Sequence, residues 1–214
     1  MNQPIAVLTG DVIASQRIDD LSTLYRVLDA TLAHLSKHHG GRFERYRGDG
    51  FQLALPSAEI ALDTALTLRA ALIMHSGKKR WDARIAVAVG QDYWQANEDL
   101  ATAQGPVFVA SGKALDAISE GASHLALVRL GAQQDAALDL LIRYADELVD
   151  GWSPASAEVA YLRLWQDESQ QAMAEKLGIR QPSVHKRLRT ARWSLLADTL
   201  DFFRHRLAEE GRTS

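Results

Sequence analysis

The stretch "GGRFERYRGDGFQLAL" at residues 40–55 holds the strongest local folding signal of the chain. Two segments that mix apolar and polar residues flank Gly48-Asp49-Gly50, and both aspartate and glycine tolerate the positive φ angles of tight turns. The stretch therefore predicts a β-hairpin with a carboxylate at its tip. That carboxylate either completes a plain turn or helps to bind a ligand.

The segments around this hairpin predict alternating strands and helices. An apolar run at Ile5–Thr9 has the length of a strand and ends in Gly10-Asp11. Residues 21–39 repeat apolar side chains at helical spacing, and Ser57 is a candidate N-cap for a second helix. The later elements are a strand at 83–90, a short helix at 112–121 and a strand at 123–130.

The resulting order, β-α-β-β-α-β followed by α-β, is typical of the ferredoxin-like, split βαβ plan. In that plan two helices cover one face of an antiparallel sheet, so we expect the α+β class. After a helical stretch at residues 131–150, "GWSPAS" combines a glycine with a Ser-Pro helix start. We therefore predict an α+β domain at 1–150 and an all-α domain at 151–214.

Two aspartates are candidate metal ligands. Asp11 follows the first predicted strand and Asp49 lies in the hairpin between the second and third, so their carboxylates meet if those strands are neighbours. Carboxylate oxygens are the ligands that Mg²⁺ and Mn²⁺ prefer, and substrate phosphates usually complete the coordination of such ions. The alternative is that neither residue binds a ligand: Asp49 is then a plain turn residue and Asp11 caps the end of a strand.

Four stretches, "LTGDVIASQ", "HGGRFERYRGDGFQLAL", "ARIAVAVG" and "GPVFVASGKAL", together resemble the catalytic domain of class III nucleotidyl cyclases over residues 4–130. The resemblance implies two metal ions on Asp11 and Asp49, aided by a backbone carbonyl near Val12 or Ile13. It also implies a base-reading residue at Arg45. The nucleotide-binding set implied in this way is Arg45, Gly48 and Lys113.

The chain departs from that family at two positions. Where cyclases carry an asparagine and an arginine that stabilise the transition state, this sequence has Phe108 or Val109, and Gly112 or Lys113. Losing such a donor costs orders of magnitude in rate. The departure favours nucleotide sensing over efficient cyclisation. The hairpin also resembles the diguanylate cyclase signature, although Gly50 stands where that signature has its second acid.

The C-terminal part carries a local excess of positive charge. The whole chain has a net charge of −3, yet residues 176–192 contain six basic residues and no acidic one. "QQAMAEKLGIRQPSVHKRLRTARWSLL" places Ala174, Gly178 and Val184 where a helix-turn-helix needs a small residue, a turn glycine and an apolar anchor. The polar side chains left pointing outward predict contact with double-stranded DNA. They are Arg180, Gln181, Ser183, His185, Lys186 and Arg189.

A cyclase-like domain followed by such a tail resembles the SatD family, and the resemblance covers nearly the whole chain. The first hypothesis is a homodimeric DNA-binding transcriptional regulator whose degenerate cyclase-like domain senses a nucleotide with Mg²⁺ or Mn²⁺. The second is a metal-dependent nucleotidyl cyclase or nucleotidyl transferase with a DNA-binding tail. The third is a dimerisation domain with a DNA-binding tail.

Bulk properties narrow the class of protein. The absence of cysteine excludes a disulfide framework and a cysteine zinc site, and a hydrophobic fraction of 47% is ordinary for a globular chain. The first residues, "MNQPIAVLTGDV", lack a charged region followed by a long apolar run, so we expect neither a signal peptide nor a membrane span. We therefore expect a cytoplasmic protein.

Overall fold

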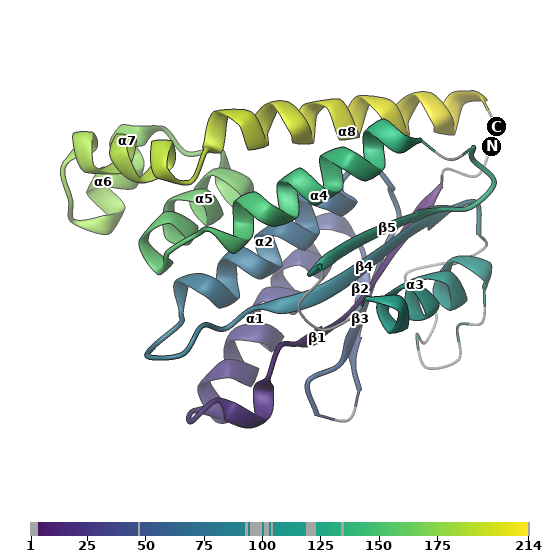
Figure 1. Ribbon diagram of the computed structural model, residues 1–214, viewed down its shortest axis with the longest axis horizontal. Coiled ribbons are helices and arrows are strands. Elements are labelled where there is room, and N and C mark those ends of the chain that lie inside the picture. Colours follow the sequence, from purple (N-terminus) through teal and green to yellow (C-terminus); the bar gives the residue numbers. More distant parts are fainter. Residues whose placement is uncertain are drawn as a thin grey trace.

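The computed structural model describes residues 4–213, apart from 47, 93, 95–99, 101, 102, 104, 119–122 and 134. Within these residues, five strands form one sheet in the order β2-β3-β1-β4-β5 (Figure 1). Their bounds are β1 Ile5–Val12, β2 Arg42–Arg45, β3 Phe51–Leu55, β4 Ala83–Gly90 and β5 Leu125–Arg129. No helix among the described residues is both long enough and apolar enough to cross a membrane.

The sheet has the topology that the order of elements predicts. Strand β3 lies between β1 and β2 and is antiparallel to both, so the first βαβ unit is split by an inserted strand. Strand β1 likewise lies between β3 and β4, and it splits the second unit. Strand β5 extends the sheet by pairing parallel to β4. The predicted α+β class with a ferredoxin-like sheet is therefore confirmed.

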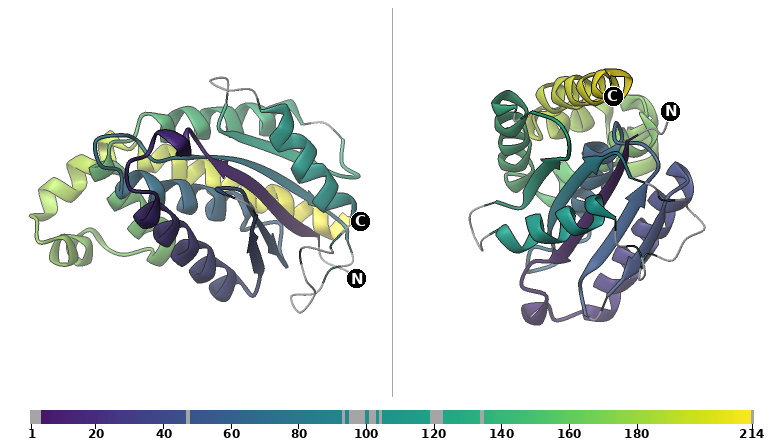
Figure 2. Two further views of the ribbon diagram at one scale, coloured as in Figure 1. Left: turned by 90° about the horizontal axis from the view of Figure 1, so that it is seen from below. Right: turned by 90° about the vertical axis from the view of Figure 1, so that its right-hand side faces the viewer.

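Helices cover both faces of this sheet (Figures 1 and 2). The first helices are α1 Leu21–His39, α2 Ala61–Met74, α3 Pro106–Ala117 and α4 Ala136–Asp150, with a short 3-10 helix, η1, at Ser15–Arg17. The later ones are α5 Pro154–Gln166, α6 Gln170–Leu177, α7 Gln181–Thr190 and α8 Trp193–Thr213. Helices α1, α2 and α4 pack on one face and α3 on the other, because the side chains of each strand alternate between two apolar clusters.

The alternation places the polar end of β1 on the α3 face. Ala6 and Leu8 belong to the cluster beneath α1 and α2, whereas Val7 belongs to the cluster beneath α3. Because successive side chains point to opposite faces, Thr9 and Asp11 follow Val7 on the α3 side. The hydroxyl of Thr9 hydrogen-bonds that of Ser111 on α3 at 2.7 Å. Asp11, two residues further along, lies where that face opens.

Helices α5 and α8 share the main core. Helix α2 is buried on nearly all sides, which suits its mainly apolar sequence, and α5 packs against it. Trp152, Ala157, Leu200 and Phe203 are buried in the same cluster as the sheet and α2. The domain boundary near residue 150 stays a prediction, and the hydrophobic core runs across it.

Helices α6 and α7 lie at one end of the molecule, beyond the sheet (Figure 1). Ser169 caps α6 by accepting the backbone N–H of Ala172 at 3.1 Å, and Gly178 ends it in the left-handed conformation with φ 63°. Pro182 stands in the first turn of α7, where its missing N–H leaves no helical hydrogen bond unmade. The three residues 178–180 between these helices turn the chain.

Three details differ from the sequence-based expectations. Helix α2 begins at Ala61, and Ser57 is not its N-cap, since the Ser57 hydroxyl accepts only the N–H of Glu59. Helix α3 begins at Pro106, six residues before the predicted start, and residues 119–121 of that prediction lie outside the described residues. Strand β1 continues to Val12, because β4 is long enough to pair with it as far as Ala83.

Candidate functional site

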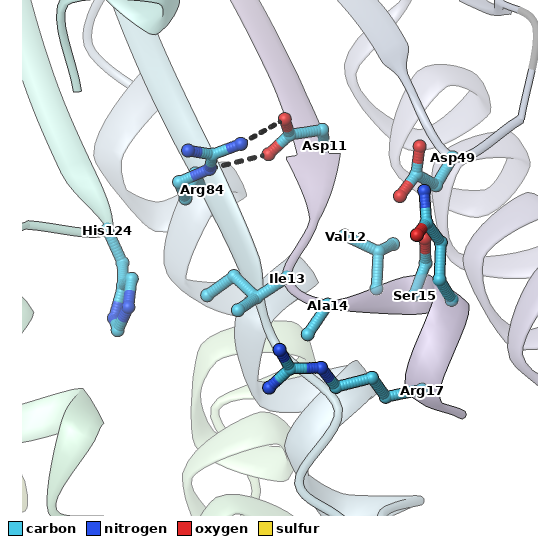
Figure 3. Close-up of a pocket in the computed structure, with 10 residues that line it drawn as sticks. Asp11, Val12, Ile13, Ala14, Ser15, Arg17, Asp49, Arg84 and His124 are labelled. Carbon is cyan, nitrogen blue, oxygen red and sulfur yellow. Dashed lines mark hydrogen bonds and ion pairs between the residues drawn. The ribbon is translucent and has the colours of Figure 1, made fainter. Parts of the chain in front are cut away.

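A cavity of about 470 Å³ opens at the carboxyl end of β1 (Figure 3). Its wall is formed by the end of β1, the η1 segment, the β2–β3 turn, the start of β4 and the residue before β5. The lining residues are Asp11, Val12, Ile13, Ala14, Ser15, Gln16, Arg17, Asp49, Arg84 and His124. Both predicted metal ligands, Asp11 and Asp49, are among them, so the fold brings them to one cavity.

The sequence suggested that Asp11 follows the first strand, but Asp11 lies within β1. It stands directly opposite Arg84 of β4, and the antiparallel pairing points both side chains to the same face. Arg84 donates from Nε to Oδ1 at 2.9 Å and from Nη2 to Oδ2 at 2.6 Å. This two-pronged, charge-assisted pair occupies both oxygens of Asp11.

Asp49 lies at the tip of the hairpin, as predicted. Gly48 precedes it with φ 82°, a left-handed conformation that favours glycine. Among the described residues no hydrogen bond or ion pair engages the Asp49 carboxylate. Figure 3 shows the Asp11 carboxylate directed toward Arg84, while Asp49 lies on the other side of the cavity. The Asp49 carboxylate offers the kind of oxygen ligand that Mg²⁺ and Mn²⁺ prefer, whereas Asp11 is already matched with a cation.

The chain turns sharply at the base of the cavity. Ile13 donates its N–H to the backbone oxygen of Asp82 at 2.9 Å, which fixes the end of β1 against β4. Ala14 follows in the left-handed conformation, with φ 49° and ψ 36°, a strain that costs about 1–2 kcal/mol for a residue with a Cβ. Arg17 ends this segment, and its guanidinium points toward the cavity in Figure 3.

The other predicted nucleotide-binding residues lie elsewhere. Arg45 is on β2 and faces α1, where it pairs with Asp29 at 2.8 Å, stacks over the Tyr25 ring at 4.6 Å and donates to the Gly48 oxygen at 2.7 Å. That is the opposite face of the sheet from Asp11. Lys113 is exposed on α3 and does not line the cavity. A nucleotide-binding role for Arg45, Gly48 and Lys113 stays a prediction.

Three of the four α3 positions that depart from the cyclase pattern offer no side-chain donor, and the fourth, Lys113, is exposed and does not line the cavity. Phe108 is buried in the apolar cluster beneath α3, and the exposed Val109 side chain is apolar. Gly112 has no side chain to contribute.

A second cluster of charged residues surrounds Arg69 of α2, which is fully buried. Arg69 donates from Nε and Nη2 to the two oxygens of Asp82 at 2.8 Å each, from Nη1 to Asp146 at 2.7 Å and from Nη2 to Asp150 at 2.6 Å. Asp146 also accepts the backbone N–H of His124 at 2.8 Å. The network ties α2, α4 and the ends of β4 and β5 together.

Asp82, His124 and Asp150 offer ligand atoms within 4.8 Å of one another, a spacing that could hold a metal ion. The Arg69 guanidinium already binds oxygens of both aspartates, so a metal ion there would compete with a buried cation. The hydrogen bond to Asp150 at 2.7 Å raises the pKa of His124, although burial and Arg69 oppose that shift. We therefore assign this triad to the Arg69 ion-pair network.

The predicted DNA-contacting residues gather on α7 and its start. Val184 and Leu188 are buried against α5 and α6, and Ala191 is buried after them, as the sequence predicted. The outward residues are all exposed: Arg180, Gln181, Ser183, His185, Lys186 and Arg189. Two nearby basic residues are paired, Arg187 with Glu158 at 2.7 Å and Lys176 with Glu168 at 2.6 Å.

Comparison with known proteins gives structural similarity alone. No protein-family model and no curated protein matches the chain. Similar solved structures include the active GGEEF domain of a diguanylate cyclase from Vibrio cholerae, with 15% identity and a TM-score of 0.46 over 61% of this chain and 85% of that one. The guanylyl cyclase Cya2 is 16% identical, with a TM-score of 0.41 over 56% of this chain and 74% of that one. The adenylyl cyclase CyaB from P. aeruginosa is 12% identical, with a TM-score of 0.41 over 54% of this chain and 72% of that one.

Arg84 and Arg69 were not among the residues predicted from the sequence. Each is the lone charged residue in an otherwise apolar stretch, Arg84 in "ARIAVAVG" and Arg69 in "ALTLRAALIM". A charged side chain in a buried element needs a partner, because an unpaired buried charge is costly. That signal could have selected both arginines, although it could not have named their aspartates.

Proposed function

We propose that this protein is a homodimeric, DNA-binding transcriptional regulator of the SatD type, whose α+β part binds a nucleotide with a metal ion. The observation that carries the DNA part is the surface of α7. Its inward side chains are apolar and buried, and its outward side chains are polar or basic and exposed. A recognition helix that enters the major groove needs this division.

The charges around α7 support the same proposal. Lys176 and Arg187 are neutralised by Glu168 and Glu158. Arg180, Lys186 and Arg189 have no acidic partner among the described residues of this region. Their charge is therefore available for phosphates, while Gln181 and Arg189 can each form two hydrogen bonds to a base edge.

A test compares DNA binding by native protein and the Lys186→Ala, Arg189→Ala double variant in a salt titration. Loss of a phosphate contact at Lys186 should reduce the salt slope by about one, because one fewer counterion is released. If Arg189 contacts a base, its loss should cost about 1–3 kcal/mol on the specific site. Fluorescence anisotropy on duplexes from the protein's own upstream region and on random duplexes measures both effects.

The control for that test is Arg143→Ala, which removes an exposed arginine from α4. It should leave the salt slope unchanged. Equal binding by the native protein and the double variant at every salt concentration would exclude a DNA-reading role. A dimerisation role for the C-terminal helices would then explain residues 153–207 better.

Dimerisation has support from exposed apolar side chains on α8. Leu195 and Phe202 are 55% and 48% exposed and lie seven residues apart, so they share one face of the helix. Two copies of α7 could then read two half-sites of a symmetric operator. A monomer by light scattering at micromolar concentration would contradict this part of the proposal.

The nucleotide part of the proposal rests on the cavity that Asp11 and Asp49 share. Mn²⁺ with a nucleoside triphosphate should raise the melting temperature of the native protein, and Asp49→Asn should reduce that shift because it removes a carboxylate that lines the cavity. An unchanged melting curve at millimolar ligand would contradict nucleotide sensing. The second candidate, a nucleotidyl cyclase or transferase, predicts a new product when each nucleotide is incubated with protein and Mn²⁺ and analysed by mass.

A further inference from the structure

The cavity at the end of β1 already contains its own positive charges. Asp11 and Asp49 contribute two carboxylates, and Arg17, Arg84 and His124 line the same space (Figure 3). A site that relied on metal ions alone to neutralise its two carboxylates would not need basic side chains beside them. The basic residues therefore call for an explanation of their own.

Arg84 holds the place at Asp11 that a metal ion would need. Its two hydrogen bonds, at 2.9 and 2.6 Å, engage both oxygens of the carboxylate. The two side chains are 23% and 27% exposed, so solvent weakens the pair only in part. A divalent cation that approached Asp11 would meet a full positive charge in contact with the same oxygens and would have to displace it.

Arg17 supplies a second guanidinium at the opposite side of the space. Its side chain has no hydrogen bond or ion pair within the described chain, and it points toward the cavity in Figure 3. The backbone oxygen of Arg17 accepts a hydrogen bond from Lys79, which helps to fix this segment. Guanidinium groups bind phosphate oxygens with paired hydrogen bonds, so Arg17 and Arg84 together suit a ligand with two or more phosphates.

We infer that Arg84 acts as a built-in cation that neutralises Asp11 in place of a divalent metal ion and that, together with Arg17, it binds the phosphate groups of a di- or triphosphate ligand. Any metal ion that enters with the ligand is then held by Asp49 and the phosphates. This inference rests on the nucleotide part of the proposed function and specifies how the site recognises its ligand. The site then contains one arginine and at most one metal ion, where the resemblance to cyclases implied two metal ions on Asp11 and Asp49.

The first experiment measures Mn²⁺ binding alone by electron paramagnetic resonance. Native protein and Asp11→Asn should bind Mn²⁺ alike, because Asp11 is unavailable in both. Arg84→Met should bind Mn²⁺ roughly tenfold tighter, since it exposes the carboxylate and removes the competing charge. Adding Asp11→Asn to Arg84→Met should abolish that gain.

Two further variants serve as controls for the Mn²⁺ measurement. Arg143→Met removes an exposed arginine from α4 and should leave Mn²⁺ binding unchanged. Arg84→Gln provides a second neutral variant if Arg84→Met proves poorly folded by circular dichroism. If Asp11→Asn alone weakened Mn²⁺ binding, Asp11 would already be a metal ligand and the inference would be overturned.

The second experiment measures binding of inorganic triphosphate in EDTA by titration calorimetry. Native protein should bind it, and Arg17→Met and Arg84→Met should each weaken binding about tenfold or more. Asp11→Asn should bind triphosphate at least as tightly as native protein, because it releases Arg84. A site bridged by metal on Asp11 would show the opposite response to that substitution.

The outcomes separate this inference from the proposed function. Binding of triphosphate only after Mn²⁺ is added would overturn the role of Arg84 and leave the nucleotide site intact. Failure of triphosphate, ATP and GTP to bind with or without Mn²⁺ would overturn both. Tighter binding of ATP or GTP than of triphosphate would support the inference and would show that the base contributes as well.

Discussion

Arg69 and Arg84 both form ion pairs with aspartates, but they differ in burial. Arg69 is fully buried and its guanidinium reaches three aspartates, whereas Arg84 is partly exposed and pairs with Asp11. Asp82 and Asp146 have only 3% and 7% of their side chains exposed, so the centre of the Arg69 network is shielded from solvent. The Arg84 pair borders a cavity of about 470 Å³. Burial therefore separates the Arg69 network, which ties the core together, from the Arg84 pair, for which we inferred a role in ligand binding.

The largest effect should come from removing the buried cation. Arg69→Met leaves Asp82 and Asp146 buried without their main partner, and breaking such a network typically costs about 3–5 kcal/mol. Arg84→Met should cost at most about 1 kcal/mol, because its pair is partly solvated and Asp11 can turn toward water. Urea unfolding of both variants measures the difference.

The comparison would fail if the two arginine variants lost similar stability. In that case the Arg84 pair would be a structural contact, and its position beside the cavity would need another explanation. Arg143→Met, on the exposed face of α4, serves as the control for removing an arginine with no described partner nearby. Its free energy of unfolding should match that of the native protein.

A smaller effect should appear as a pH dependence of the Arg69 network. The hydrogen bond to Asp150 raises the pKa of His124 above its ordinary value of 6.5 in the folded protein. The stabilisation from protonated His124 is therefore fully present below pH 6.5 and is lost as the pH rises through the raised pKa. Burial shifts the pKa of His39 in the opposite direction, so its contribution has the opposite sign.

The urea midpoints of native protein and His124→Gln, measured between roughly pH 5.5 and 9, give the contribution of protonated His124 to stability. The advantage of native protein over the variant should shrink as the pH rises. A constant difference across that range would show that the His124 proton does not contribute to the network. The pKa of Asp150 is lowered by His124 and Arg69 against the effect of burial, so its titration falls below this range.

The α7 surface gives a further contrast with the cavity. On α7 the sequence pattern was enough to name both the buried and the exposed residues, because a single helix has a known periodicity. Val184 and Leu188 proved buried and Lys186 and Arg189 exposed. At the cavity the sequence pattern indicated Asp11 and Asp49 but not Arg84, which pairs with Asp11.

The sequence alone determined the order of elements, the hairpin with Asp49 at its tip and the two faces of α7. These features depend on turn residues, on helix caps and on periods of two or 3.6 residues, all of which are local. The split βαβ order also follows, because few topologies accommodate that order of strands and helices.

Only the tertiary structure decided which charges meet. Asp11 faces Arg84 across a strand pairing that joins residues 73 positions apart, and Arg69 meets Asp146 across 77. Such contacts depend on strand register and helix packing, which the local pattern does not encode. The alternation of side chains then placed Arg45 on the face opposite Asp11, because one residue of offset along a strand moves a side chain to the other side of the sheet.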